Sequence, residues 1–591
     1  MTRLRNGAPL GPVVVLAVVL VLGGCVNVPT SGEVERVEPT TRATQPVVDL
    51  RVNPPVDGAS PRLIVSGFLQ AMADYQPNYE VARQFLAEEV RDAWRPESGV
   101  QIISDDYFPE VTEDSAVLRV PLVGTLGADR TYRSATGTLQ LDFKLVRNSA
   151  GQWRISNPPE GLLITEYNFE QFYRPVDLYF FEPGMGSLVP NTIYLPRSNL
   201  SASSMVRWLV NGPSTWLAPA VTTAFPERTP ATAVPVDDRG VAQVSLGDGA
   251  TSLTEQQRSL VAAQTAWTLR QLPGITGVRF LVNGTPFLVP GADADQVVPI
   301  DAFPAYGPVA SQISTQLFGA TSQGLARLDD AGGRDPAPVP GPLGSLPGIG
   351  DFAVAPEGDR AAVVVAGDTE LRTGVLGERD PTTVIQGESH LRQPQFTRFD
   401  ELLVLGTRNA RPVLWYLHDG ALQQVSLDLP DGLSLSAFRV APDGVRVAVV
   451  LRDTDGQSHF GLALLQRSGS ATLTGFRAVP LTLAQGTPLG SVTDIAWTSA
   501  TRLVLLGSAS ADNQPRPYQV AEDGTGLTAL GATEDRAPYR LAAAQQRNGS
   551  GAGSASAKIA MLGEDGTVWR YENAVTWVSM AEGLHSLAYP G

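Results

Sequence analysis

The chain has 591 residues, a formal net charge of −16 at pH 7 and a single cysteine. One cysteine excludes a disulfide framework, and the acidic balance argues against nucleic acid as a ligand, because phosphate backbones are bound by clustered Lys and Arg. The length allows three or four domains, each with a packed core.

A secretory signal is expected over residues 1–24. Arg3 and Arg5 are its only charged residues, and they precede the ten apolar residues VVVLAVVLVL at positions 13–22. Such a run is short for a membrane span, but it matches the apolar core of a signal peptide. We therefore expect this segment to direct export.

The single cysteine, Cys25, lies just beyond that apolar run. Leu22, Gly23, Gly24 and Cys25 resemble the bacterial lipobox, in which the cysteine sulfur receives a diacylglycerol and becomes the new N-terminus. The resemblance implies that Cys25 is a lipidation site and that the protein is anchored in the bilayer on the extracytoplasmic face of the cell membrane. The alternative is an ordinary signal that is cut nearby, with Cys25 incidental.

Residues 25–60 have scattered prolines and no sustained hydrophobic period, which is typical of a tether. A helical pattern begins at Pro61, and the apolar residues between Val81 and Trp94 predict a second helix. The period then changes to two, which predicts strands over residues 115–122, 138–146 and 153–155. We interpret residues 61–175 as an α+β domain that resembles the nuclear-transport-factor-2-like cone.

Residues 176–300 mix strand and helix patterns. Strands are predicted at 177–181 and 188–195, helices over 199–213 and from a capping-box spacing at Ser252 to Glu255, and a hairpin around Asn283-Gly284. The strings YFF, LVPNTIYLPR, MVRWLVNGPS and VRFLVNGTPF resemble the GerM-type α/β domain of germination and sporulation proteins. That resemblance implies a binding module with no catalytic residues.

Residues 310–591 carry a repeat. FAVAPEGDRAAVVV, beginning at Phe352, nearly recurs as FRVAPDGVRVAVVL, beginning at Phe438, with looser copies from Phe396 and Ile495. A period near 43 residues, with strand, turn and apolar strand in each unit, predicts a β-propeller of about six or seven blades. The whole chain is therefore expected to be a multi-domain protein of α+β and all-β parts.

The sequence shows no motif that predicts a catalytic or ligand-binding site. It has no nucleophile elbow, no phosphate-binding glycine loop and no Cys/His ligand set, so we expect no catalytic, cofactor-binding or metal-binding residues and no enzyme activity. A hydrolase that uses only a carboxylate pair remains open, because such a pair could come from different blades.

Signal, tether, cone-like domain, GerM-type domain and propeller occur in the order that resembles the LpqB family of actinobacterial lipoproteins. The stretches LGGC at residues 22–25, VPTSG at 28–32 and the FxVAPxG repeats carry the resemblance. It implies an accessory protein of the Mtr two-component system that contacts the extracellular domain of the sensor histidine kinase and influences the cell envelope.

Two classes of function follow. In the first, the protein modulates the kinase by binding it from the membrane surface. In the second, it binds envelope glycans or hydrolyses the cell wall with carboxylates. The two differ in whether a propeller face holds two free carboxylates in a cleft or offers a broad contact surface.

Overall fold

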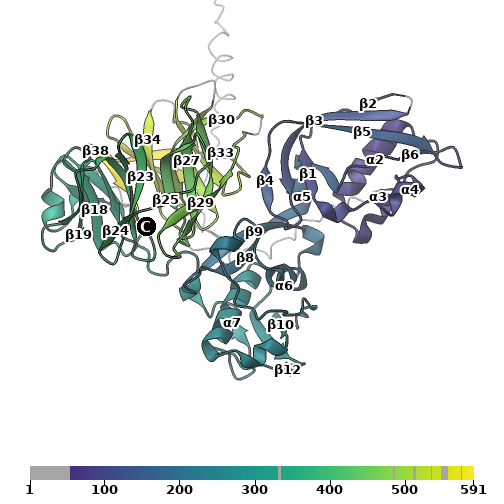
Figure 1. Ribbon diagram of the computed structural model, residues 1–591, viewed down its shortest axis with the longest axis horizontal. Coiled ribbons are helices and arrows are strands. Elements are labelled where there is room, and N and C mark those ends of the chain that lie inside the picture. The colour runs from purple at the N-terminus through teal and green to yellow at the C-terminus, as the bar shows by residue number, and fades with distance from the viewer. Residues whose placement is uncertain are drawn as a thin grey trace, which may run out of the picture. The chain divides into compact units, whose positions relative to one another are not determined.

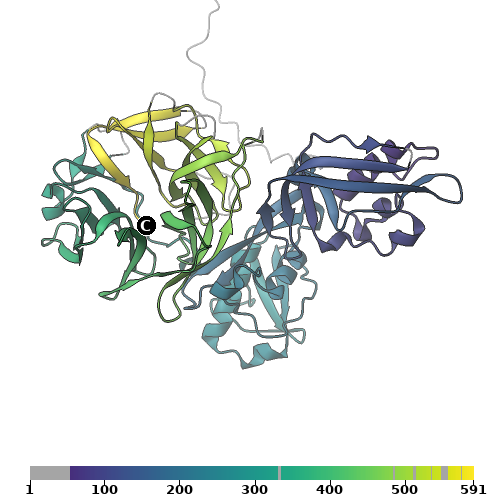
Figure 2. The same ribbon diagram turned by 45° about the horizontal axis from the view of Figure 1, so that its top comes forward.

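The computed structural model describes residues 53–112, 114–329, 335–483, 486–509, 514–533, 536–546, 557–573 and 576–591, and their contacts form one compact unit. Among these residues no helix is long and apolar enough to cross a membrane. Figures 1 and 2 show the unit from two directions.

The N-terminal domain packs one long helix on a curved sheet (Figure 1). The helix α2 (Pro61–Ala73) turns its predicted face inward, with Ile64, Phe68 and Met72 buried. The sheet has the order β6-β5-β3-β1-β7, with β7 parallel to β1 and with β2 and β4 also paired to β3. Its strands are β1 (Val100–Ile103), β2 (Glu110–Val111), β3 (Ser115–Leu126), β4 (Tyr132–Ser134), β5 (Thr138–Arg147), β6 (Trp153–Ile155) and β7 (Leu162–Thr165). The α+β prediction is thus confirmed, while the likeness to the nuclear-transport-factor-2-like cone stays a prediction.

The predicted second helix of this domain is wrong. Two short helices, α3 (Glu80–Arg83) and α4 (Glu88–Arg91), stand in its place. Between them the backbone leaves the helix to pair with the sheet, because the N–H of Ile155 donates to Phe85 O at 2.9 Å and the N–H of Ala87 donates to Ile155 O at 2.8 Å. These hydrogen bonds join residues about 70 positions apart, so the local spacing of apolar residues could not predict them.

The middle domain begins where α5 (Glu166–Phe172) continues directly into β8 (Tyr173–Phe181). β8 pairs with β9 (Leu188–Pro196), and β10 (Val241–Leu246) runs parallel to β11 (Gly277–Val282). The remaining elements are α6 (Ala202–Asn211), α7 (Glu255–Leu269), β12 (Thr285–Pro286) and β13 (Val298–Pro299). The Asn283-Gly284 hairpin is confirmed, and both residues adopt the positive φ that such a turn requires.

The capping box of α7 lies two residues later than predicted. Thr254 and Gln257 satisfy each other's backbone N–H groups, at 2.9 and 3.3 Å, instead of Ser252 and Glu255. Residues Asp248–Ser252 form a 3-10 turn, which delays the start of the α-helix.

The described residues of the C-terminal domain form six sheets, one for each blade of a propeller. Each FxVAPxG copy supplies the first strand of a blade and the turn into the second. The ring closes because the C-terminal β38 pairs with β14, which begins the domain. The blades are β14 (Leu317–Thr321), β15 (Leu325–Leu328) and β16 (Ala337–Pro338) with β38 (Leu584–Ala588); β17 (Asp351–Val354), β18 (Arg360–Val365), β19 (Glu370–Val375) and β20 (Thr382–Gln386); β21 (Ser389–Phe396), β22 (Leu402–Arg408), β23 (Arg411–His418) and β24 (Ala421–Gln424); β26 (Ser434–Val440), β27 (Arg446–Arg452), β28 (Ser458–Gln466) and β29 (Thr472–Ala478) with β25 (Ser426–Leu427); β30 (Leu489–Trp497), β31 (Arg502–Ala509), β32 (Arg516–Ala521) and β33 (Thr528–Ala529); and β34 (Pro538–Ala543), β35 (Ile559–Gly563), β36 (Val568–Asn573) and β37 (Thr576–Ala581).

Candidate functional site

The predicted lipidation site lies outside the described residues. Leu22, Gly23, Gly24 and Cys25 therefore have no structural account, and the acyl anchor stays a prediction. Within the described ranges, no three His, Cys, Asp or Glu side chains gather in a way that could hold a metal ion.

The middle domain and the propeller meet over an apolar cluster. Val189, Leu217 and Ala220 of the middle domain are buried against Val445 and Leu464 of the propeller. Beside this cluster, Trp216 donates its indole N–H to Gly475 O at 2.7 Å and lies 4.4 Å from the Arg477 guanidinium. The joint therefore combines burial of apolar surface with directional contacts.

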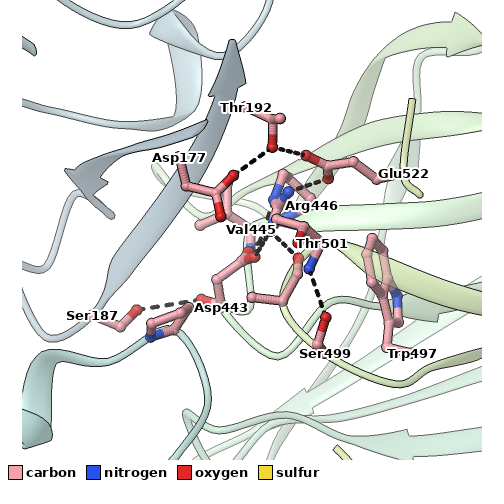
Figure 3. A network of polar contacts seen from close by, with 12 residues as sticks. Asp177, Ser187, Thr192, Asp443, Val445, Arg446, Trp497, Ser499, Thr501 and Glu522 are labelled. Carbon is pink, nitrogen blue, oxygen red and sulfur yellow. Dashed lines mark hydrogen bonds and ion pairs between the residues drawn. The ribbon is translucent and has the colours of Figure 1, made fainter. Parts of the chain in front are cut away.

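At the centre of this joint lies Arg446, which is only 1% exposed (Figure 3). Its Nε and Nη2 donate to Asp443 Oδ2 at 3.0 and 2.6 Å, Nη2 also donates to Ala500 O at 2.5 Å, and Nη1 contacts Glu522. Thr192 Oγ1 of the middle domain donates to Asp177 Oδ1 at 2.7 Å and lies 3.4 Å from Glu522 Oε1. The network thus links the two domains through buried charge.

Three further polar contacts fasten the same region. Tyr194 donates its hydroxyl to Asp523 Oδ2 at 2.8 Å, and Ser187 donates to Asp443 O at 3.3 Å. Ser134 of the N-terminal domain donates to Asp523 O at 2.9 Å. The N-terminal domain and the middle domain therefore both contact the face of the propeller that carries Asp443 and Asp523.

Sequence reasoning missed this site, although the repeat contains a signal for it. Arg446 and Asp443 occupy positions in the FxVAPxG copy at Phe438 that match Arg360 and Glu357 in the copy at Phe352. Arg360 is 35% exposed and pairs with Asp400. The same repeat position is thus a surface ion pair in one blade and a buried ion pair in another, because the middle domain covers only the second.

The junction contains more negative than positive groups. Asp177, Asp443, Glu522 and Asp523 lie around Arg446, and Arg477 also interacts with Glu522 and Asp523. Burial raises the pKa of Glu522 to about 7, since loss of hydration outweighs the attraction of Arg446 and Arg477 and the nearby Asp177 and Asp523 oppose a further negative charge. Burial also raises the pKa of Asp177. A proton on Glu522 therefore relieves the imbalance.

This proton makes stability depend on pH. The folded-state pKa of Glu522, about 7, lies above its ordinary value of 4.5, so the folded protein holds a proton that the unfolded chain releases. The resulting stabilisation is complete below the unfolded pKa and is lost as the pH rises through 7, with a slope of at most about 1.4 kcal/mol per pH unit. We expect the thermal midpoint of the propeller to fall between pH 6 and pH 8.

Glu522→Gln is expected to flatten that decline, because the amide does not titrate. The matched control is Glu572→Gln, in an exposed pair with Arg570 on the propeller surface. Thermal unfolding of both variants at pH 6, 7 and 8 checks the expectation, and an equal slope in wild type and Glu522→Gln would contradict it.

Asp351 and Asp494 line a cavity between the innermost strands of the blades, which we call the central channel, and neighbouring strands engage both carboxylates. Asp351 accepts from the N–H groups of Phe352 and Gln393, at 3.0 and 2.8 Å, and from Ser586 Oγ at 3.0 Å. Asp494 accepts from the N–H of Leu541 at 2.8 Å. Although burial raises the pKa of Asp351, Arg540 and the N–H of Gln393 bring it below its usual range, so this carboxylate stays ionised.

Family profiles match three parts of the chain: "Lipoprotein LpqB, N-terminal domain" at residues 54–170, "Sporulation and spore germination" at 177–287 and "Lipoprotein LpqB beta-propeller domain" at 324–584. A "Lipoprotein LpqB" of Cutibacterium acnes is 31% identical over 97% of this chain and 98% of its own length. One from Streptomyces coelicolor is 30% identical over 88% of this chain and 91% of its own length. The first GerMN domain of the Bacillus subtilis sporulation protein GerM is 21% identical over 21% of this chain and 92% of that structure, with a TM-score of 0.17.

Proposed function

Because the chain belongs to the Lipoprotein LpqB family, a family of exported lipoproteins, we propose that it is an accessory protein held at the extracytoplasmic face of the cell membrane by acyl chains on Cys25. Its role is to bind the extracytoplasmic domain of a sensor histidine kinase and so to modulate signalling that governs the cell envelope. It acts by binding and not by turnover.

The observation that carries this proposal is an aromatic surface on the N-terminal domain. Phe108 is 81% exposed and Tyr167 is 59% exposed. Asp105, in the loop that carries Phe108, accepts a hydrogen bond from the N–H of Tyr167 at 3.1 Å, so the loop contacts the first turn of α5. Exposed aromatic side chains are the most frequent anchors of protein interfaces.

Acidic side chains surround these two aromatic residues. All of them are exposed: Asp105, Asp106, Glu110, Glu166 and Glu170. Although the Glu166 residue is exposed, partial loss of hydration at its carboxyl group raises the pKa of Glu166, and repulsion by Glu170 and Asp105 raises it further. A partner that carries basic side chains around an apolar pocket complements this surface, and opposite potentials also speed the encounter.

The joint between the domains supports a binding role. With Arg446 buried in the junction, the middle domain and the propeller offer one continuous surface rather than two independent ones. A continuous surface lowers the entropy lost when a partner is bound. A specific complex with the kinase buries about 1,000 Å² or more of surface.

The acyl anchor strengthens a weak interface. Two or more acyl chains hold a protein stably at a bilayer, and a kinase in the same membrane is then met at a high effective concentration. An intrinsic dissociation constant in the micromolar range between the two proteins is therefore enough for the complex to form at the membrane.

The channel carboxylates favour binding over hydrolysis. A glycoside hydrolase needs one protonated carboxyl group as its general acid. Asp351 is held in its ionised form by Arg540 and by backbone donors, and Asp494 is engaged by the next strand. Asp351 therefore lacks the protonated form that a general acid needs.

Replacing Phe108 and Tyr167 together with Ser is expected to weaken kinase binding by about 30-fold or more, the usual cost of removing aromatic anchors. Binding is measured with the full-length lipoprotein in lipid nanodiscs and the purified extracytoplasmic kinase domain. The control is Leu288→Ser, since Leu288 is 61% exposed but lies in the middle domain.

If both variants lose kinase binding equally, or if neither loses it, the kinase contacts a surface other than the one that carries Phe108 and Tyr167. If the kinase domain does not bind the wild-type protein and envelope glycans do, the glycan-binding or hydrolase alternative replaces the proposal.

A further inference from the structure

A small cavity lies where the three domains meet. It has a volume of about 20 Å³, and its walls include Thr131 and Tyr132 of the N-terminal domain, Asn191 and Thr192 of the middle domain, and Glu522 and Asp523 of the propeller. One water needs about 15 Å³ by this measure, so the cavity has room for a single water beside Glu522. The Glu522 carboxyl group therefore depends on protein groups, and not on bulk solvent, for its hydrogen bonds.

A row of three oxygen atoms crosses the joint between the middle domain and the propeller (Figure 3). Thr192 Oγ1 of β9 lies 2.7 Å from Asp177 Oδ1 of β8 and 3.4 Å from Glu522 Oε1, in the loop that follows β32. An ionised carboxylate only accepts hydrogen bonds, and a hydroxyl group has one proton to donate. Thr192 can therefore donate to one carboxylate at a time, and a bond to both requires a second proton on one of the two carboxyl groups.

This second proton completes a hydrogen-bonded chain between the domains. If Glu522 holds it, Glu522 donates to Thr192, and Thr192 donates to Asp177; if Asp177 holds it, both bonds run in the opposite direction. Burial raises the pKa of Glu522 to about 7, above its ordinary value of 4.5. The chain is therefore complete at pH 6 and is broken in most molecules at pH 8.

The other charged and titratable groups around Glu522 do not replace the proton. They come from all three domains: Arg446, Arg477, Asp177, Asp443, Asp523, Tyr132 and Tyr194. Burial raises the pKa of both tyrosines, so their hydroxyl groups stay neutral. Arg446 divides its guanidinium group between Asp443 and Glu522. When Glu522 ionises, the negative charges of Asp177 and Asp523 oppose it.

Elsewhere the same joint is held by contacts that do not titrate. Val189 and Leu217 of the middle domain are buried against Val445 and Leu464 of the propeller. Apolar burial does not depend on pH, whereas the contact between Thr192 and Glu522 depends on one proton. The two domains therefore stay attached through the apolar cluster when Glu522 ionises, and the attachment beside Glu522 is released.

We propose that the joint between the middle domain and the propeller is a proton-operated latch, which a proton shared among Glu522, Thr192 and Asp177 closes and which opens when that proton leaves to solvent. In the closed state the two domains move as one body. In the open state water enters the cavity and the middle domain tilts about the apolar cluster. The protein thereby changes shape with the pH of its surroundings, and the inference is independent of kinase binding.

Energy transfer between two fluorescent dyes, one on the middle domain and one on the propeller, tests the latch. The dyes are attached to non-natural amino acids in place of Leu288 and Leu422, which are 61% and 40% exposed, on the full-length protein in nanodiscs. The ratio of open to closed molecules is expected to rise by about tenfold from pH 6 to pH 8. This is the effect of one proton whose pKa falls from about 7 to the ordinary 4.5 when the joint opens.

Three variants separate the latch from a general effect of pH. Glu522→Gln is expected to stay closed at both pH values, because its amide donates to Thr192 and does not titrate. Thr192→Val is expected to raise the ratio of open to closed molecules at pH 6 by about fivefold or more, the usual effect of losing buried hydrogen bonds, and Thr192→Ser is expected to restore it. The matched control Glu572→Gln, in the exposed pair with Arg570, is expected to respond to pH as the wild type does.

Equal energy transfer at pH 6 and pH 8 in the wild type overturns the proposal, even if the thermal midpoint of the propeller falls with pH. The proton then stabilises the propeller without moving the joint. An equal pH response in wild type and Glu522→Gln, or a joint that stays closed in Thr192→Val at pH 6, also overturns it.

Discussion

Replacing Arg446 with Ala is expected to destabilise the propeller by about 3–5 kcal/mol, because it leaves buried carboxylates without a counter-charge. Asp443 is 0% exposed and Glu522 is 6% exposed, so solvent cannot replace the guanidinium. For a domain of this size, the loss lowers the thermal midpoint of the propeller by roughly 10 °C. Calorimetry of the purified protein measures the shift.

The repeat provides a matched control for this experiment. Arg360 occupies the equivalent position two blades earlier in the chain. Its side chain is 35% exposed and pairs with the exposed Asp400. Arg360→Ala is expected to cost less than about 1 kcal/mol. Similar losses in the two variants would mean that the repeat position, and not the cover provided by the middle domain, determines the effect.

Replacing Cys25 with Ser is expected to move the protein from the membrane fraction to the soluble fraction almost completely. The sulfur of Cys25 is the proposed acylation site, and each buried methylene of an acyl chain contributes about 0.8 kcal/mol of membrane affinity. Fractionation of cells that express each form, followed by detection of the protein, measures the change.

Metabolic labelling with radioactive palmitate provides the second readout. The wild type is expected to incorporate the label and Cys25→Ser to incorporate none. Absence of label from the wild type, or an unchanged membrane fraction for the variant, would contradict the anchor.

Local periodicity predicted much of the fold. The spacing of Ile64, Phe68 and Met72 predicts the buried face of α2, and the FxVAPxG repeats predict the first two strands of their blades. Both patterns depend on contacts near in sequence. The repeat alone allows six or seven blades, because ring closure depends on the pairing of β14 with β38, which are separated by more than 250 residues.

Long-range pairing also explains what the sequence did not reveal about the sites. In the sequence, Arg446 cannot be told apart from the arginines of the other repeats. Its burial depends on Thr192 and Val189 of the middle domain, which pack beside it. Arg439 and Arg540 lie on different blades, so the cavity that both of them line cannot be inferred from spacing. Phe108 has no periodic partner, and only its exposure in the folded chain marks it.

Site-specific photocrosslinking from position 108, in membranes that contain the anchored protein and the kinase, tests the central claim most directly. A crosslinker in place of Phe108 is expected to capture the extracytoplasmic domain of the kinase, and a crosslinker in place of Leu288 is expected not to. Capture of envelope glycans from position 108, with no kinase adduct, would contradict the account.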